Sequence, residues 1–217
     1  NGIGTVQCIT PAFNQPLLNK KMLDNNFACV PYVGEGMYVT YAFNFTGGSL
    51  LKWYRDNFAR DYKKEAKETG ASVYSLLDEN AARQPTEILV LPHFAGAGTP
   101  YMDMSAKGAI MGLTFDTDDS KFYRALMEGT TYEMLYNLEC LNQAGLNVDT
   151  LKAVGGGARS DLWLQIKADI LGKKILALDV EEAGTLGTVI LAGTATGVYD
   201  SIEKAAGSLI NIKKEFR

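Results

Sequence analysis

The stretch that decides the fold reads Leu151-Lys152-Ala153-Val154-Gly155-Gly156-Gly157-Ala158-Arg159-Ser160, a short apolar strand followed by three glycines. A helix is predicted to begin at Ser160 or Asp161 and to end at Gly172, because serine and aspartate are good N-caps and glycine commonly stops helices. Glycine has no Cβ atom, so another molecule can lie against its backbone. A strand, a glycine turn and a helix N-terminus together are typical of a nucleotide-binding site. The structural alternative is a tight turn that lets the helix pack closely on the strand.

Length and composition indicate the class of protein. The chain has 217 residues, of which 47% are hydrophobic and 21% charged, and this suits one or two globular domains. A net charge of −4 and the lack of a long basic run speak against a nucleic-acid partner. Three widely spaced cysteines fit neither a disulfide framework nor a zinc site, and they suit a reducing, cytoplasmic location. No apolar run reaches the roughly 18 residues of a membrane span. The start at Asn1, inside a glycine turn, predicts a piece of a longer protein.

Apolar periodicity and turn residues predict alternating strands and helices. Strands are expected within residues 2–9, 27–33, 37–43, 88–91, 108–113, 151–154 and 174–179, and the run at 88–91 reads as buried. Helices are expected from residue 46 onward, at 60–68, at 72–82, at 120–144 and at 184–197. The last of these is rich in alanine, glycine and threonine, and its small residues predict close approach to a helix, a sheet or a cofactor.

Several familiar catalytic patterns are missing from the sequence. It contains no P-loop, no strict G-x-G-x-x-G and no G-x-S-x-G motif. The only histidine, His93, lies between a proline and a phenylalanine and is interpreted as structural. Asp116, Asp118 and Asp119 precede the long helix, so they are interpreted as a helix start rather than as metal ligands.

Three glycine elements are not explained by packing alone: Gly4-Thr5, Gly47-Gly48-Ser49 and Gly155-Gly156-Gly157. Exposed backbone N–H groups in such turns bind phosphate oxygens, and a threonine hydroxyl adds a donor. Each turn offers only a few donors, whereas a triphosphate carries several charges that must be met together. The sequence therefore predicts that the three turns face one cleft.

At this point the chain resembles the FGGY carbohydrate kinases, which include xylulokinase, gluconokinase and glycerol kinase. The resemblance covers nearly the whole chain, as the C-terminal domain of that two-domain family. Gly4-Thr5 resembles the second phosphate loop, residues 94–108 the G-E-R-x-P-x-x-D-x-x-A-R-G segment, and residues 155–172 the adenosine motif. Residues 108–113 with Ala125 and Glu128 resemble the second signature. The helix that follows the adenosine motif is matched by Glu182, Leu186, Gly187 and Ala192.

The chain also departs from the family pattern. Ala97 and Gly98 replace the usual Glu-Arg pair, and Lys121 stands where the signature prefers an acid, an amide or a histidine. The family's final helical segment is expected to be absent after Arg217. The N-terminal domain, which carries the first phosphate loop, most sugar contacts and the catalytic aspartate, is expected to lie outside this chain.

The resemblance implies an actin-like ATPase fold, which is an RNase H-like α/β domain with a mixed sheet flanked by helices. Residues 1–217 would form the C-terminal nucleotide-binding domain of a sugar kinase that transfers the ATP γ-phosphoryl group to a sugar or polyol hydroxyl. The implied cofactors are ATP and Mg²⁺. The implied partners are a small sugar and the N-terminal domain, with a homodimer as one assembly to consider.

The resemblance also implies site residues, none of them catalytic or metal-ligating. Gly4 and Thr5 would contact the terminal phosphates, and Gly48 would approach the nucleotide with Lys52 one helical turn away. The adenosine would be lined by Gly156, Gly157 and Ala158. Asp161 would stand where the family often has an amide near the base, although a helix N-cap explains it equally well.

Two other functions stay open from sequence. One is a non-catalytic actin-fold module that binds a nucleotide or a partner protein. The other is a dinucleotide-dependent oxidoreductase built around Gly155–Gly157, in which an acidic residue about 20 positions on would hold a ribose. Asp179 lies at about that distance, but this alternative does not explain the other motifs.

Overall fold

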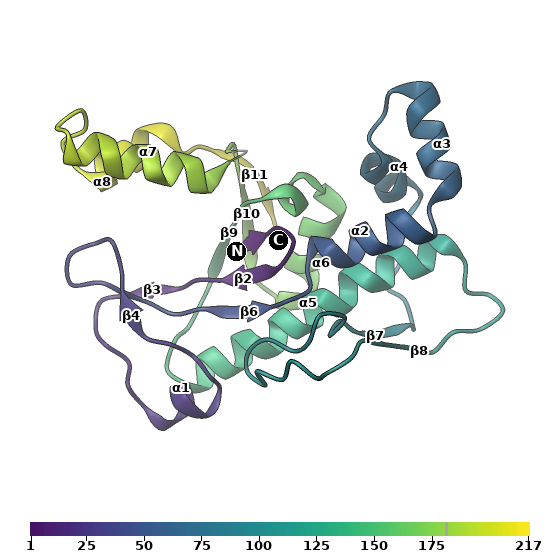
Figure 1. Ribbon diagram of the computed structural model, residues 1–217, viewed down its shortest axis with the longest axis horizontal. Helices are drawn as coiled ribbons and strands as arrows, with labels where there is room; N and C mark the ends of the chain where they lie inside the picture. Colours follow the sequence, from purple (N-terminus) through teal and green to yellow (C-terminus); the bar gives the residue numbers. More distant parts are fainter. Residues whose placement is uncertain (181) are drawn as a thin grey trace.

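A mixed sheet lies at the centre of the computed structural model, which describes residues 1–180 and 182–217 (Figure 1). One part of the sheet is antiparallel and consists of β1 (Gly2–Ile3), β2 (Gln7–Ile9) and β6 (Ala42–Asn44). The other part pairs β9 (Thr150–Ala153) parallel with β10 (Lys174–Leu178), which pairs antiparallel with β11 (Ile212–Phe216). A parallel bridge between Gly2 and Val154 joins the two parts. The strand order is therefore β6-β2-β1-β9-β10-β11, the mixed sheet that was expected.

Helices flank this sheet, and the longest of them runs diagonally across the molecule in Figure 1. The helices are α1 (Lys20–Asp24), α2 (Gly48–Asn57), α3 (Arg60–Thr69), α4 (Val73–Asn80), α5 (Asp119–Gln143), the 3-10 turn η1 (Gly156–Arg159), α6 (Asp161–Leu171), α7 (Ala183–Ala195) and α8 (Ile202–Leu209). The remaining strands are β3 (Ala12–Phe13), β4 (Val30–Pro31) and β5 (Tyr38–Val39), which form one small sheet, and the pair β7 (Leu89–Leu91) and β8 (Ala109–Met111).

The core lies between the central sheet and helices α5 and α6, which pack against each other. On α5 the apolar side chains recur at helical spacing, and the buried ones include Tyr123, Met127, Met134 and Leu141. The start of α5 is capped by Asp118, whose carboxylate accepts from the Lys121 N–H at 2.9 Å. The interpretation of the aspartate cluster as a helix start is therefore confirmed.

The predicted helix ends are confirmed where a cap residue marks them. A prediction of burial from apolarity alone, however, is wrong in β7. In β7 only Val90 is buried, while Leu89 is 60% exposed, so the prediction of a buried strand is wrong. The two-stranded sheet presents one face to α5 and leaves the other uncovered in the described structure. Residues 37–43 also divide between β5 and β6 instead of forming one strand.

The small residues of α7 do not mediate the predicted close approach to another helix or to the sheet, apart from Gly193, and approach to a cofactor stays a prediction. Cβ atoms at Gly184 and Gly187 would meet no other heavy atom within 4 Å, and Gly193 alone of these glycines packs closely, against Tyr199. Figure 1 shows α7 and α8 lying together, apart from the long helix. Among the helices in the described part of the chain, none is long and apolar enough to span a bilayer.

Candidate functional site

The first glycine turn, residues 4–6, connects β1 to β2. Its Gly4 N–H donates to the Val6 carbonyl at 3.0 Å, and the Thr5 carbonyl accepts from the N–H groups of Gly47 and Ser49. Thr5 itself is exposed. The turn is thus held by the backbone of the second glycine element, while the threonine side chain stays accessible.

The second glycine turn, residues 47–49, opens helix α2 and lies directly against the first. The Gly48 N–H donates to the Gly4 carbonyl at 2.8 Å. A Cβ atom at Gly48 would lie 2.8 Å from that same oxygen, and one at Gly47 would lie 2.7 Å from the Val6 carbonyl carbon. Real Cβ atoms do not approach backbone this closely, so the contact between the two turns explains both glycines.

The third glycine turn, residues 155–158, lies against β1 on the other side. The Ile3 N–H donates to the Val154 carbonyl at 2.8 Å, and a Cβ atom at Gly155 would lie 2.9 Å from the Ile3 carbonyl oxygen. Gly155 also has a φ of +95°, a conformation that favours glycine. The three glycine elements, far apart in sequence, therefore meet around the turn between β1 and β2. Their contact was expected, and the cleft that they were predicted to line stays a prediction.

Within the third turn, Gly156 and Gly157 have opposite surroundings. A Cβ atom at Gly156 would meet nothing within 4 Å, so its backbone faces open space. A Cβ atom at Gly157 would overlap the Ile3 side chain and lie 2.8 Å from the Trp163 ring. Gly157 thus allows close packing on the core, and the open approach for a ligand lies at Gly156. Ala158 packs partly against the core beside them.

Asp161 is not the N-cap of helix α6. That position belongs to Ser160, whose hydroxyl accepts from the Trp163 N–H at 3.0 Å. Asp161 is the first helical residue, and its carboxylate lies 2.6 Å from Nζ of Lys214 on β11. The N-cap interpretation of Asp161 is therefore wrong, and the exposed carboxylate forms an ion pair at the rim of the third turn.

Lys52 lies one helical turn after Gly48, with its ammonium exposed. Its Nζ is 2.6 Å from Oδ2 of Asp56. Hydrogen bonds from Lys52 and then from Arg55 lower the pKa of Asp56, which stays ionised. Exposed pairs of this kind contribute little to stability, so Lys52 can leave Asp56 for another anion at small cost.

The sequence interpretation assigned no role to Gln7 and Lys167, which lie beneath the turns together with Trp163, a residue of the resembled adenosine motif. Lys167 is completely buried on α6, and its Nζ donates to Oε1 of Gln7. The same ammonium lies 5.3 Å from the centroid of the Trp163 ring. Burial lowers the pKa of Lys167 to about 7. The available signal was its spacing, because Lys167 follows Trp163 by four residues and therefore shares its helix face.

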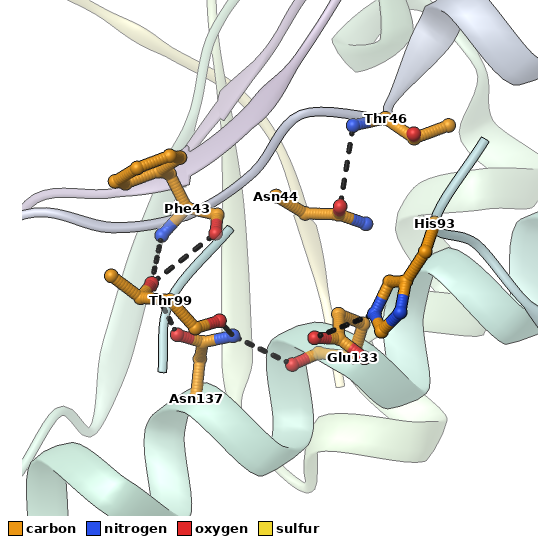
Figure 2. Close-up of polar contacts among 7 residues, drawn as sticks. All are labelled: Phe43, Asn44, Thr46, His93, Thr99, Glu133 and Asn137. Carbon is orange, nitrogen blue, oxygen red and sulfur yellow. Dashed lines mark hydrogen bonds and ion pairs between the residues drawn. The ribbon is translucent and has the colours of Figure 1, made fainter. Parts of the chain in front are cut away.

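Below this region, residues 92–107 are joined to α5 by a buried polar network (Figure 2). Thr99 Oγ1 accepts from the Phe43 N–H at 2.7 Å and donates to Oδ1 of Asn137 at 2.7 Å. Nε2 of His93 lies 3.4 Å from Oε1 of Glu133, and both side chains are buried. Burial raises the pKa of Glu133. His93 is therefore placed as a packing residue against α5, in keeping with its structural interpretation.

The same segment explains one departure from the resembled pattern. Ala97 is buried, and a Cβ atom at Gly98 would overlap the carbonyl oxygen of Phe43. Backbone is close on that side of Gly98, and the Thr99 N–H donates to the same Phe43 carbonyl. An arginine at position 98 would require β6 to move. The Glu-Arg pair is thus replaced by a direct contact between two backbone segments.

Comparison with known proteins identifies similar sequences and folds. Residues 2–196 match the family described as "FGGY family of carbohydrate kinases, C-terminal domain". Xylulose kinase of Bacillus subtilis is 29% identical over 173 residues, which cover 80% of this chain and 33% of that protein. Glycerol kinase of Lactobacillus acidophilus is 31% identical over 185 residues, covering 83% and 35%. The chain therefore spans about a third of the length of these relatives.

Solved structures share the fold at lower sequence identity. The glycerol kinase of Plasmodium falciparum, solved with ADP, matches all of this chain and 42% of its own, with a TM-score of 0.79 and 22% identity. A ligand-bound xylulose kinase of Lactobacillus acidophilus matches 99% of this chain and 41% of its own, with a TM-score of 0.77 and 21% identity. Identities this low establish the fold, and the mixed α/β arrangement described above is the one that these kinases share.

Proposed function

The chain belongs to the FGGY family of carbohydrate kinases, and from this premise we propose that it forms the nucleotide-binding half of a sugar or polyol kinase. Residues 1–217 would be the C-terminal, actin-like domain of a two-domain enzyme that transfers the ATP γ-phosphoryl group to a hydroxyl. The observation that carries the proposal is the convergence of three glycine turns around one open backbone, at Gly156.

The proposed nucleotide lies along these turns. Gly4 and Thr5 would meet the terminal phosphates, because the threonine hydroxyl is accessible there. Gly48 would lie beside them at the start of α2, and Lys52 would turn from Asp56 toward the phosphates. The adenosine would lie against Gly156 and Ala158, with Gly157 supporting the turn from below and Asp161 at its rim.

We propose that Mg²⁺ is held mainly by the phosphates of the nucleotide rather than by side chains of this domain. In the described residues no three His, Cys, Asp or Glu side chains gather as a metal site. Mg²⁺ commonly keeps several waters and is held by substrate phosphates with one or two carboxylates. Such an ion would add charge neutralisation to phosphoryl transfer.

The sugar contacts and the catalytic carboxylate are proposed to lie in a separate N-terminal domain. That base would accept the proton of the attacking hydroxyl. The three cysteines are free, which agrees with the proposed cytoplasmic location. A homodimer remains an assembly to test. The family match across residues 2–196 argues against a dinucleotide oxidoreductase, whose support was a single glycine turn with Asp179.

We expect the 217-residue chain to bind ATP about tenfold or more weakly than the complete protein and to catalyse no turnover. The reason is that one side of the nucleotide would contact a second domain. Calorimetry of ATP binding and a coupled assay with xylulose, gluconate and glycerol measure the two effects. Turnover of any of these by the chain alone would contradict the proposal.

An assay of ADP release by the complete protein distinguishes a kinase from a non-catalytic module of the same fold. A kinase should release ADP in the presence of one of a panel of sugars and polyols, above its rate with water alone. ATP binding without sugar-dependent ADP release for any member of a broad panel would favour the non-catalytic module.

A further inference from the structure

Lys167 is a buried cation that the proposed function does not yet use. It lies in the middle of α6 with no exposed surface, and its ammonium has one hydrogen-bond acceptor, Oε1 of Gln7. In the described part of the chain no carboxylate forms an ion pair with it. A buried charge without a partner is costly, and such residues are often retained for function.

Two side chains connect this ammonium to all three glycine turns. Gln7 follows the first turn directly in β2, and its Cγ lies 2.8 Å from the Cβ position of Gly47 in the second turn. Trp163, whose ring lies under the ammonium, is 2.8 Å from the Cβ position of Gly157 in the third turn. Lys167 thus lies at the point beneath the site where the supports of the three turns meet.

We propose that Lys167 is a positioning residue for the phosphates of the bound nucleotide. It acts through Gln7 and Trp163, which fix the turns, and its positive charge lies below the turns on which the phosphates would rest. This inference rests on the proposed nucleotide site. The phosphates would be the anions that balance the buried ammonium.

The charges around Lys167 favour this role. The titratable group that interacts with Lys167 is the amino group of Asn1, on the β1 side. In the two-domain protein proposed above, this nitrogen would belong to a peptide bond and carry no charge, and among the described residues no carboxylate contributes to the pKa of Lys167. Burial therefore leaves the pKa of Lys167 at about 7 in the free protein. A nearby phosphate favours the charged form, so nucleotide binding should be accompanied by proton uptake.

The test is calorimetry of ADP binding to the complete protein at pH 7.5, in buffers that differ in ionisation enthalpy. If phosphate raises the pKa of Lys167 by about one unit, about half a proton should be taken up by the wild type beyond that taken up by Lys167→Met. The affinity of Lys167→Met should be about fivefold lower than wild type at pH 7, and the ratio should approach one by about pH 10. Lys174→Met removes a partly exposed lysine at the start of β10; it is the matched control and should follow the wild type at every pH.

Each outcome has a distinct meaning. A loss of affinity in Lys167→Met that is the same at all pH values would show a purely structural role and overturn the inference. If Lys167→Met does not fold, Lys167→Gln replaces it, and a wild type that takes up no proton on binding ADP overturns the inference by itself. A wild type that binds neither ADP nor ATP overturns the proposed function together with this inference.

Discussion

Replacing Gly157 with valine is expected to lower the free energy of unfolding by about 3 kcal/mol, because the added side chain enters a filled space. Its Cβ atom would overlap Ile3 and lie 2.8 Å from the ring of Trp163, and both of these neighbours are buried in the core. Neither can move easily, since Ile3 belongs to a central strand and Trp163 to helix α6. Urea unfolding of the wild type and the variant measures the loss.

Gly156→Val is the matched variant, and it should show the opposite pattern. A Cβ atom there meets nothing within 4 Å, so the free energy of unfolding should change by less than about 1 kcal/mol. Nucleotide affinity should instead fall about tenfold or more, because the branched side chain occupies the open backbone approach. Unchanged ATP affinity in folded Gly156→Val would mean that the nucleotide does not lie against the third turn.

The contrast between these two glycines shows where sequence reasoning stops. The pattern of three glycines between a strand and a helix predicted the turn, and Ser160 and Gly172 predicted the ends of the helix, because caps are local interactions. Which glycine faces solvent depends on Ile3, which is about 150 residues away in sequence. The resemblance could therefore assign Gly156 and Gly157 the same role, although only the first has free space beside it.

Burial is the property that the sequence predicted least well. The apolar run at residues 88–91 indicated a strand correctly, but apolarity alone does not say that both faces are covered, and Leu89 lies exposed. Lys167 is the opposite case, because lysine side chains are rarely buried and this one has no exposed surface. Both outcomes are set by tertiary neighbours: α5 covers one face of β7, and α6 turns Lys167 toward the central sheet.

Glu128→Ala is expected to lower the free energy of unfolding by about 3 to 5 kcal/mol, because it leaves a buried charge without its partner. Nε of Arg124 lies 2.6 Å from Oε1 of Glu128, and both side chains are almost completely buried. Glu128 also accepts from the backbone N–H and the hydroxyl of Thr86. After the substitution the guanidinium would keep only the carbonyls of Ala82 and Arg83 as hydrogen-bond partners among the described residues.

Two further variants separate the charge effect from packing. Asp24→Ala breaks the exposed Lys20–Asp24 pair at the same helical spacing and should cost less than about 1 kcal/mol. Arg124→Met combined with Glu128→Met removes both charges and should recover most of the loss. A loss below about 1 kcal/mol in Glu128→Ala would contradict the prediction. The expected result gives Glu128, a residue of the resembled second signature, a structural role, because it joins α5 to Thr86 in the chain that enters β7.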